Sequence, residues 1–248
     1  MCNAIVNLNR RGSRPARLGA ALMVLSACMP GCRLISHGQN AEGVTMYQQG
    51  YYQGAIQRFQ QAINTDRNNP DGYYNLAATY HQLGKLNHRP EDLTQAETLY
   101  NQCLDKDANH RDCHRGLAVL LAENGRGEEA FRLLDGWAAR NPSLAAAKIE
   151  LARLSEEFGR LDTAQAHLIE AVNLDPNNPQ ALAALGRLRE LSGNPAQALA
   201  DYERSLAQGH QPEVAARASL LRQALVAAPV TTPAGGTRIV NGNPLPRY

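Results

Sequence analysis

Apolar residues recur every three or four positions along most of the chain, which is the spacing of one face of an amphipathic helix. The clearest stretch contains Leu151, Leu154, Phe158, Leu161, Ala164, Leu168 and Ala171. Gly159 falls in the middle of that stretch, so the pattern predicts two helices joined by a turn. The low aromatic content and the many Ala and Leu residues agree with an all-α protein.

Small residues mark a repeat along these helices. Glycine returns at Gly50, Gly84, Gly125, Gly159 and Gly193, and the successive spacings are 34, 41, 34 and 34. Alanine lies five residues after four of these glycines, and the full alanine series is Ala55, Ala96, Ala130, Ala164 and Ala198. One seven-residue insertion, Leu86–Asp92, explains both series, with Pro90 opening the helix that follows it. We expect each glycine to make the turn and each alanine to let the two helices approach.

Residues 145–178 resemble a tetratricopeptide repeat. The matching positions are Leu151, Ala152, Gly159, Ala164, Ala171 and Asp175-Pro176. The resemblance implies a right-handed α-α superhelix with repeats at about 36–69, 70–110, 111–144, 145–178 and 179–212. A pair of such helices cannot bury its apolar stripe alone, so adjacent repeats stack and the ends need caps. We therefore expect a solenoid over residues 38–212 and a capping helix over residues 213–226.

The N-terminus has the order of a secretion signal. Residues 1–27 contain four arginines and no acidic residue, followed by the apolar run 18–25. Leu25-Ser26-Ala27-Cys28 resembles the bacterial lipobox, which implies cleavage after residue 27 and lipidation (palmitate) of Cys28, with residues 28–37 as a tether. Cys32 is a weaker lipidation site because Pro30 precedes it. A plain secretory signal and an uncleaved anchor stay open as alternatives, and the twin-arginine signal at Arg10-Arg11 is weak.

Charge and composition narrow the classes of partner. Without residues 1–27 the chain carries 21 basic and 23 acidic residues, so the domain is close to neutral. Nucleic acid is excluded as a partner on this ground, because phosphate binding needs clustered Lys and Arg. Residues 227–248 are rich in Pro, Gly, Thr and Asn, and we expect a disordered tail there.

No phosphate loop, nucleophile elbow or paired-histidine metal helix occurs, so we expect neither an enzyme nor a cofactor. Cys103, His110, Cys113 and His114 gather near one inter-repeat turn. Their spacing is unlike a zinc finger, so a metal is disfavoured. A Cys103–Cys113 disulfide and two unpaired thiols both stay open. Trp137 stands where most repeats have a small residue, which indicates local repacking.

The family resemblance also implies a groove lined by the first helix of each repeat. By that register the groove residues are Tyr74, Asn75, Ala78, His81, Arg115, Val119, Glu150, Arg153, Arg187 and Glu190. Asn75 is the favoured ligand contact, since an amide can pair with both the donor and the acceptor of an extended backbone. Asp112 and Gly116 replace the basic pair that some family members use to clamp a carboxylate, so that mode of binding is not expected.

Together these features predict a non-catalytic scaffold in the bacterial cell envelope. The lipid would attach it to a membrane, facing the periplasm, with the outer membrane slightly favoured because Met29 is not the aspartate that often marks inner-membrane retention. The groove would hold a segment of another envelope protein, within a pilus, secretion or cell-wall assembly. The alternatives are a self-assembling subunit, which would be a homo-oligomer, and, less favoured, a Cys/His metal protein.

Overall fold

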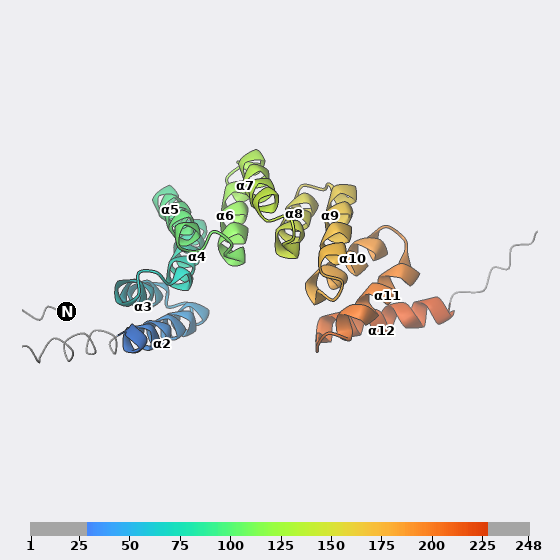
Figure 1. Ribbon diagram of the computed structural model, residues 1–248, viewed down its shortest axis with the longest axis horizontal. Coiled ribbons are helices and arrows are strands. Elements are labelled where there is room, and N and C mark those ends of the chain that lie inside the picture. Colours follow the sequence, from blue (N-terminus) through green and yellow to red (C-terminus); the bar gives the residue numbers. More distant parts are fainter. Residues whose placement is uncertain (1–28, 228–248) are drawn as a thin grey trace, which may run out of the picture. The chain divides into compact units, whose positions relative to one another are not determined.

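The computed structural model describes residues 29–227, and within that range it contains eleven helices and no strand. The all-α repeat fold predicted from the sequence is thereby confirmed. The helices, labelled in Figure 1, are α2 (Met29–Gln48), α3 (Tyr52–Thr65), α4 (Pro70–Asn87), α5 (Pro90–Lys106), α6 (Arg111–Glu123), α7 (Gly127–Arg140), α8 (Ala145–Glu157), α9 (Leu161–Leu174), α10 (Pro179–Leu191), α11 (Pro195–Leu206) and α12 (Pro212–Ala227).

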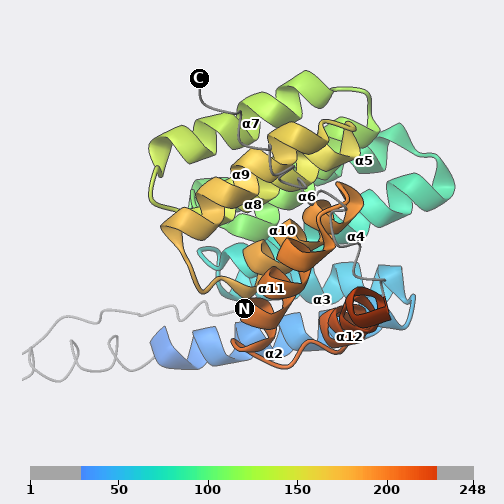
Figure 2. The same ribbon diagram turned by 90° about the vertical axis from the view of Figure 1, so that its right-hand side faces the viewer.

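The chain divides after Pro142 into two units, which are described separately. Unit 1 contains α2 to α7 and unit 2 contains α8 to α12. The even-numbered helices α2 to α10 are the first helices of the repeats, and each packs against the odd-numbered helix that follows it, while α12 packs on α11. Within unit 1, α2, α3 and α4 lie side by side (Figure 2), and the first helices α2, α4 and α6 also contact one another directly.

Short polar residues and glycines set the helix ends. Asn69 and Asn178 cap α4 and α10 by accepting hydrogen bonds from backbone N–H groups, and a proline follows each of them. Four of the repeat glycines, Gly50, Gly125, Gly159 and Gly193, have φ between 70° and 80°. This left-handed conformation is readily adopted only by glycine, so these positions make the turns between paired helices as predicted.

Gly84 does not make a turn, which corrects the sequence prediction for the second repeat. The insertion extends α4 to Asn87, and His88 takes the left-handed conformation with φ 52°. α5 then begins at Pro90, as predicted. Gly84 is instead needed for close packing, because a Cβ atom there would lie 2.5 Å from Cδ2 of Leu93. Space for Leu93, and not a turn, therefore accounts for this glycine.

In the first, fourth and fifth repeats a small residue on the first helix packs on a large residue on the second. Gly43 packs on the buried Phe59 in the first repeat, and Gly186 packs on Tyr202 in the fifth. In the fourth repeat the corresponding pair is Ala152 and Leu168, both buried in the core of unit 2. In these three repeats glycine goes with an aromatic ring and alanine with leucine, which keeps the two helices close together. The second repeat differs, because its buried residues at these positions are Ala77 and Tyr100.

The N-terminal boundary of the solenoid differs from the prediction. α2 begins at Met29, and Ser36 is fully buried, with its Oγ donating to the carbonyl of Ala62 at 3.0 Å. Residue 36 therefore belongs to the packed repeat, and residues 28–37 are not simply a tether. None of the helices between residues 29 and 227 is both long and apolar enough to span a bilayer.

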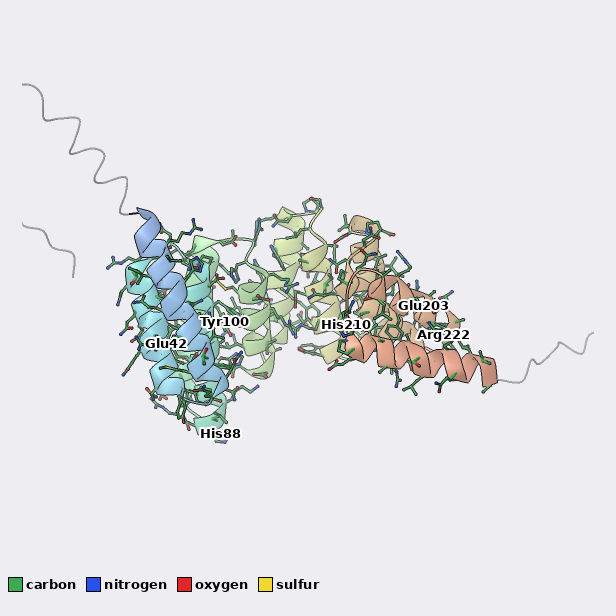
Figure 3. All side chains as sticks on the ribbon, turned by 90° about the horizontal axis from the view of Figure 1, so that it is seen from below. Glu42, His88, Tyr100, Glu203, His210 and Arg222 are labelled. Atoms are coloured by element: carbon green, nitrogen blue, oxygen red, sulfur yellow. A yellow bond between two sulfur atoms is a disulfide. The ribbon has the colours of Figure 1, made fainter. Side chains whose placement is uncertain are left out.

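At the other end, the residues expected to form a capping helix lie in α12. Its Ala218 and Leu221 are buried against Ala198 and Tyr202, and Arg222 pairs with Glu203 of α11 at 2.6 Å (Figure 3). The predicted signal sequence, Cys28 and residues 228–248 of the predicted tail lie outside the described residues.

Candidate functional site: a groove pocket in each unit

The first helices of unit 1 form a pocket of about 260 Å³. It lies between α2 and α4, above Phe59 of α3, which is 1% exposed. Its lining residues are Val44, Tyr47, Gln48, Phe59, Tyr74, Asn75 and Ala78. Three predicted groove residues, Tyr74, Asn75 and Ala78, therefore meet at one concave site. None of these lining side chains carries a charge at neutral pH.

Neighbouring repeats hold the polar side chains of this pocket in place. Asn75 donates from Nδ2 to Oδ1 of Asn40 on α2 at 3.0 Å, which orients its amide. The Tyr74 ring lies 6.3 Å from the ring of Tyr100 and 5.9 Å from that of His110. Burial, together with the nearby Asp112, raises the pKa of Tyr74. Its hydroxyl group is therefore protonated at neutral pH and can donate a hydrogen bond.

His81, one turn further along α4, has a structural role. It is buried, its Nε2 lies 2.9 Å from Oε2 of Glu123 on α6, and Lys85 contacts the other carboxylate oxygen at 2.6 Å. Burial lowers the pKa of His81, although the carboxylate of Glu123 opposes this effect. Burial alone would raise the pKa of Glu123, but the bonds from Lys85 and His81 lower it overall. This cluster joins α4 to α6.

The other groove residues predicted in unit 1 lie on α6. Arg115 is exposed and Val119 is half-buried. Both precede Glu123 on the same face of α6 by helical spacing, and neither lines the unit 1 pocket.

In unit 2 the predicted groove residues are held in ion pairs. Glu150 is buried and accepts from Nε of Arg153 at 3.0 Å. Arg187 of α10 pairs with Glu156 of α8. Glu190 accepts from Nε of Arg217 at 2.8 Å and from the hydroxyl of Tyr202 at 3.2 Å. The Arg187–Glu156 pair joins α10 to α8 and the Arg217–Glu190 pair joins α12 to α10, whereas Glu150 and Arg153 both lie on α8.

Unit 2 has its own pocket, of about 430 Å³, between α10 and α12. Its lining residues are Ala183, Ala184, Arg187, Leu191, Tyr202, Glu213, Val214 and Arg217. Unlike the pocket of unit 1, it has charged residues at its rim. It also uses the predicted capping helix as a wall, so α12 contributes to a site as well as closing the solenoid.

A disulfide joins Cys103 at the end of α5 to Cys113 at the start of α6, with 6.4 Å between their Cα atoms. His110 lies between the two cysteines. Its Nδ1 accepts from the backbone N–H of Cys113 at 3.2 Å, so Nε2 carries the proton that faces Asp71 at 3.1 Å. The two sulfurs and a His110 nitrogen lie within 4.8 Å of one another, but bonded sulfurs offer no thiolate to a metal.

His114 stands apart from that group of three. It is buried, its ring stacks on Trp137 with 4.2 Å between centroids, and its Nε2 donates to the carbonyl of Ala108 at 3.0 Å. Trp137 is fully buried and donates from Nε1 to Oδ1 of Asn109 at 3.2 Å. Trp137 is therefore accommodated by its own stacking and hydrogen-bond partners.

The groove predicted from the sequence contained three of the seven residues that line the unit 1 pocket and one of the eight that line the unit 2 pocket. In unit 1 it omitted Val44, Tyr47 and Gln48, because the groove register was applied only from the second repeat onward. Val44 and Ala78 stand one repeat period apart, as do Tyr47 and His81, so the repeat spacing could have located both. In unit 2 it contained Arg187 alone, and it omitted Glu213, Val214 and Arg217 because residues 213–226 were expected only to cap the core.

Three matches to known repeat families cover most of the described chain. Residues 43–84 match the family described as TPR repeat, and residues 89–154 and 149–212 match families described as tetratricopeptide repeat. The chain belongs to the tetratricopeptide-repeat family. Its repeats are those of a protein–protein interaction scaffold.

Curated relatives of this tetratricopeptide-repeat chain are distant and longer. It is 24% identical over 183 residues to a DnaJ homolog subfamily C member 7 homolog of Schizosaccharomyces pombe, which covers 69% of this chain and 38% of the relative. It is 28% identical over 135 residues to cellulose synthase operon protein C of Pseudomonas fluorescens, which covers 51% of this chain and 11% of the relative. The chain therefore spans well under half of either relative.

Solved structures share the tetratricopeptide-repeat fold. A thermophilic TPR protein of Thermus thermophilus has a TM-score of 0.56 at 23% identity, covering 76% of this chain and 99% of that one. PilW, a type IV pilus biogenesis factor, has a TM-score of 0.53 at 19% identity, covering 78% and 87%. PilF of Pseudomonas aeruginosa has a TM-score of 0.52 at 20% identity, covering 79% and 86%. At these identities the likeness concerns the fold.

Proposed function

We propose that this protein is an adaptor of the bacterial cell envelope. A lipid on Cys28 holds it at a membrane, facing the periplasm, and the groove of its repeats binds a segment of another envelope protein. The outer membrane is favoured as the site of attachment. The protein carries out no reaction of its own and acts by placing its partner beside the membrane.

The unit 1 pocket is the observation that carries the proposal. Ligand sites in proteins are concave and mostly apolar, with a few placed polar groups. The pocket meets this description, since its floor is Phe59, its walls include two tyrosines, and the amide of Asn75 is oriented by Asn40. Aromatic residues in such a position contribute strongly to protein binding.

The proposed location in the envelope is supported by the N-terminal sequence and by the names of two similar proteins. Leu25-Ser26-Ala27-Cys28 has the residues of a lipobox behind an arginine-rich, apolar leader. Cellulose synthase operon protein C of Pseudomonas fluorescens and the type IV pilus biogenesis factor PilW are among the similar proteins. An assembly of this class, such as a pilus, is where we place the partner.

Crosslinking in the native cells, followed by mass spectrometry, tests the adaptor. The wild type is compared with the double variant Tyr74→Ala, Asn75→Ala and with the control Tyr51→Ala, which removes an exposed tyrosine outside the pocket. We expect the double variant to lose one dominant partner that the control retains. Partners unchanged in both variants, or crosslinks only between copies of this chain, would replace the adaptor by a self-assembling subunit.

The anchor is tested separately. We expect wild type to incorporate labelled palmitate and to sediment with membranes, Cys28→Ser to lose both properties, and Cys32→Ser to keep them. Palmitate labelling that survives in Cys28→Ser but is lost in Cys32→Ser would move the anchor to Cys32. Absence of label in wild type would overturn lipidation while leaving the groove to be judged by crosslinking.

A further inference from the structure

The two pockets occupy the same place in the repeat. Gly50 and Gly193 are equivalent positions of the first and fifth repeats. Residues that line the first pocket have equivalents, at the same separation along the chain, that line the second pocket. The corresponding pairs are Val44 and Arg187, Gln48 and Leu191, Phe59 and Tyr202, and Tyr74 and Arg217. The two pockets therefore form at equivalent positions of the repeat backbone. They differ in the side chains that line them, and so in the ligands that they can bind.

The chemistry of the two hollows differs in charge. In unit 2 the arginines at these positions, Arg187 and Arg217, form ion pairs with Glu156 and Glu190. In unit 1 the same positions are Val44 and Tyr74, and no lining side chain is charged. A charged ligand group entering the unit 1 pocket would lose water and meet no counter-charge among the lining side chains, which is unfavourable. Lys85, Asp112 and Arg115, which act electrostatically on the two tyrosines, do not line the pocket. The unit 1 pocket therefore selects for an uncharged side chain.

The walls of the unit 1 pocket include two tyrosines whose hydroxyl groups can donate hydrogen bonds to carbonyl groups of a ligand backbone. Tyr74 and Tyr47 each present a hydroxyl group whose pKa burial raises, so both stay protonated and can donate. Gln48 and Asn75 add side-chain amides, which can donate and accept, and Nδ2 of Asn75 already donates to Asn40. A polyproline II segment has free carbonyl groups, few N–H groups and no internal hydrogen bonds, and its rings pack against aromatic faces.

We propose that the unit 1 pocket binds an extended, uncharged, proline-containing segment of the partner, with one proline or aliphatic side chain against Phe59. This inference rests on the proposed adaptor function and adds the chemical class of the ligand. The ordering cost of such a segment is low because polyproline II is already populated in the free chain.

Peptide binding to the full chain, purified in detergent, tests the ligand class. The probe is a fluorescein-labelled peptide containing Pro-Pro-Leu-Pro between Gly-Ser flanks, measured by fluorescence anisotropy. Its comparators replace the three prolines by alanine, or the leucine by aspartate or lysine. We expect the proline peptide to bind about tenfold more tightly than each comparator, which corresponds to about 1.4 kcal/mol. Equal binding of the aspartate or the alanine peptide would overturn the proposal.

Exchanging residues between the pockets tests the location. Val44→Arg gives the unit 1 pocket the residue of unit 2, and Arg187→Val is the matched control. Gln48→Glu adds a charge at an exposed lining position, where folding is not at stake. We expect Val44→Arg and Gln48→Glu to weaken the proline peptide about tenfold or more, with Arg187→Val unchanged. Unaltered binding in Gln48→Glu and in a folded Val44→Arg would contradict the assignment.

The two proposals fail in different ways. If the proline peptide does not bind while the partner is still lost from crosslinks of the Tyr74→Ala, Asn75→Ala variant, the ligand class is wrong and the adaptor stands. If neither experiment reports binding through this pocket, the adaptor function falls as well.

Discussion

The junction after the second repeat and the junction after the fourth have the same geometry and different chemistry. In unit 1, Cys103 and Cys113 form a disulfide across the junction. In unit 2 the corresponding residues, two repeat periods later, are Ala171 and Ala181, which are fully buried in one apolar cluster. The same small space between consecutive repeats is thus closed by a covalent bond in one unit and by packed methyl groups in the other.

This difference shows which property of the position matters. The repeat requires a residue small enough for the helices to approach, and either alanine or cysteine meets that need. Trp137 occupies the same position of the third repeat and violates the rule. It is accommodated because His114 stacks on it and Asn109 accepts its N–H group. Substituting residues of unit 1 by those at matching positions of unit 2 therefore tests two things separately. One is the need of every repeat for a small residue at this position, and the other is the set of neighbours that accommodates an exception such as Trp137.

The largest effect is expected from Trp137→Ala, which installs the residue found at Ala171. A fully buried indole would leave a cavity beside His114, so we expect a loss of about 3–5 kcal/mol in the free energy of unfolding. Urea denaturation followed by far-UV circular dichroism measures it. A loss below about 1 kcal/mol would mean that the neighbouring helices move together and fill the cavity, so that alanine packs there as Ala171 does in unit 2.

Next in size is the double variant Cys103→Ala, Cys113→Ala, which copies Ala171 and Ala181. Because alanine fits this junction, the variant removes the crosslink with little loss of packing. A crosslink closing ten residues contributes about 2–3 kcal/mol. Urea unfolding of the variant should match that of wild type kept in dithiothreitol. If oxidised wild type and the variant unfold at the same urea concentration, the disulfide contributes nothing to stability.

Gly43→Ala tests the small-and-large pairing of the repeat core. A Cβ atom at Gly43 would lie 2.5 Å from Cε1 of Phe59, so overpacking should cost about 1–3 kcal/mol. Adding Phe59→Leu recreates the alanine and leucine pair of the fourth repeat and should recover part of that loss. The control Gly38→Ala, in the same helix with nothing within 4 Å, should gain up to about 1 kcal/mol. Thermal unfolding that ranks Gly43→Ala with the control would refute the pairing rule.

The smallest effect is a pH dependence centred on His114, whose counterpart in unit 2 is the buried Leu182. Burial lowers the pKa of folded His114 despite its bond to Ala108. The unfolded chain therefore takes up this proton first as the pH falls below about 6.5, and stability decreases in that direction; above that pH the effect is absent.

His114→Leu should therefore flatten the fall in melting temperature between pH 7.5 and 5, while the exposed control His210→Gln should not. His81, whose pKa burial also lowers, leaves a residual slope. A slope unchanged by His114→Leu would assign the whole pH dependence to other groups.

The sequence was sufficient for the repeat and its period. Helix spacing, the glycine series and the Asn-Pro caps depend on local backbone preferences, and such preferences act within a few residues of one another. For the same reason Pro90 was correctly expected to open α5. These signals identify all-α architecture and the order of the helices without knowledge of any distant contact.

Contacts between residues of different helices could be known only from the packed structure. Gly84 was taken for a turn, yet only its packing against Leu93 explains its presence inside α4. His81 was predicted to contact a ligand because of its position in the groove register. In the structure its ring pairs with Glu123, 42 residues away, so it has a structural role instead. The unit 1 pocket depends in the same way on α2, α3 and α4 together.

Helix formation depends on short-range patterns that recur in each repeat, so the family resemblance, the period and the apolar face of residues 151–171 could be recognised from the sequence alone. The hollows, the disulfide and the ion pairs arise where one repeat is stacked on the next. Their chemistry depends on pairs of residues separated by ten to more than forty positions. Only the packed structure brings such pairs within contact distance, because the space between helices is set jointly by both partners.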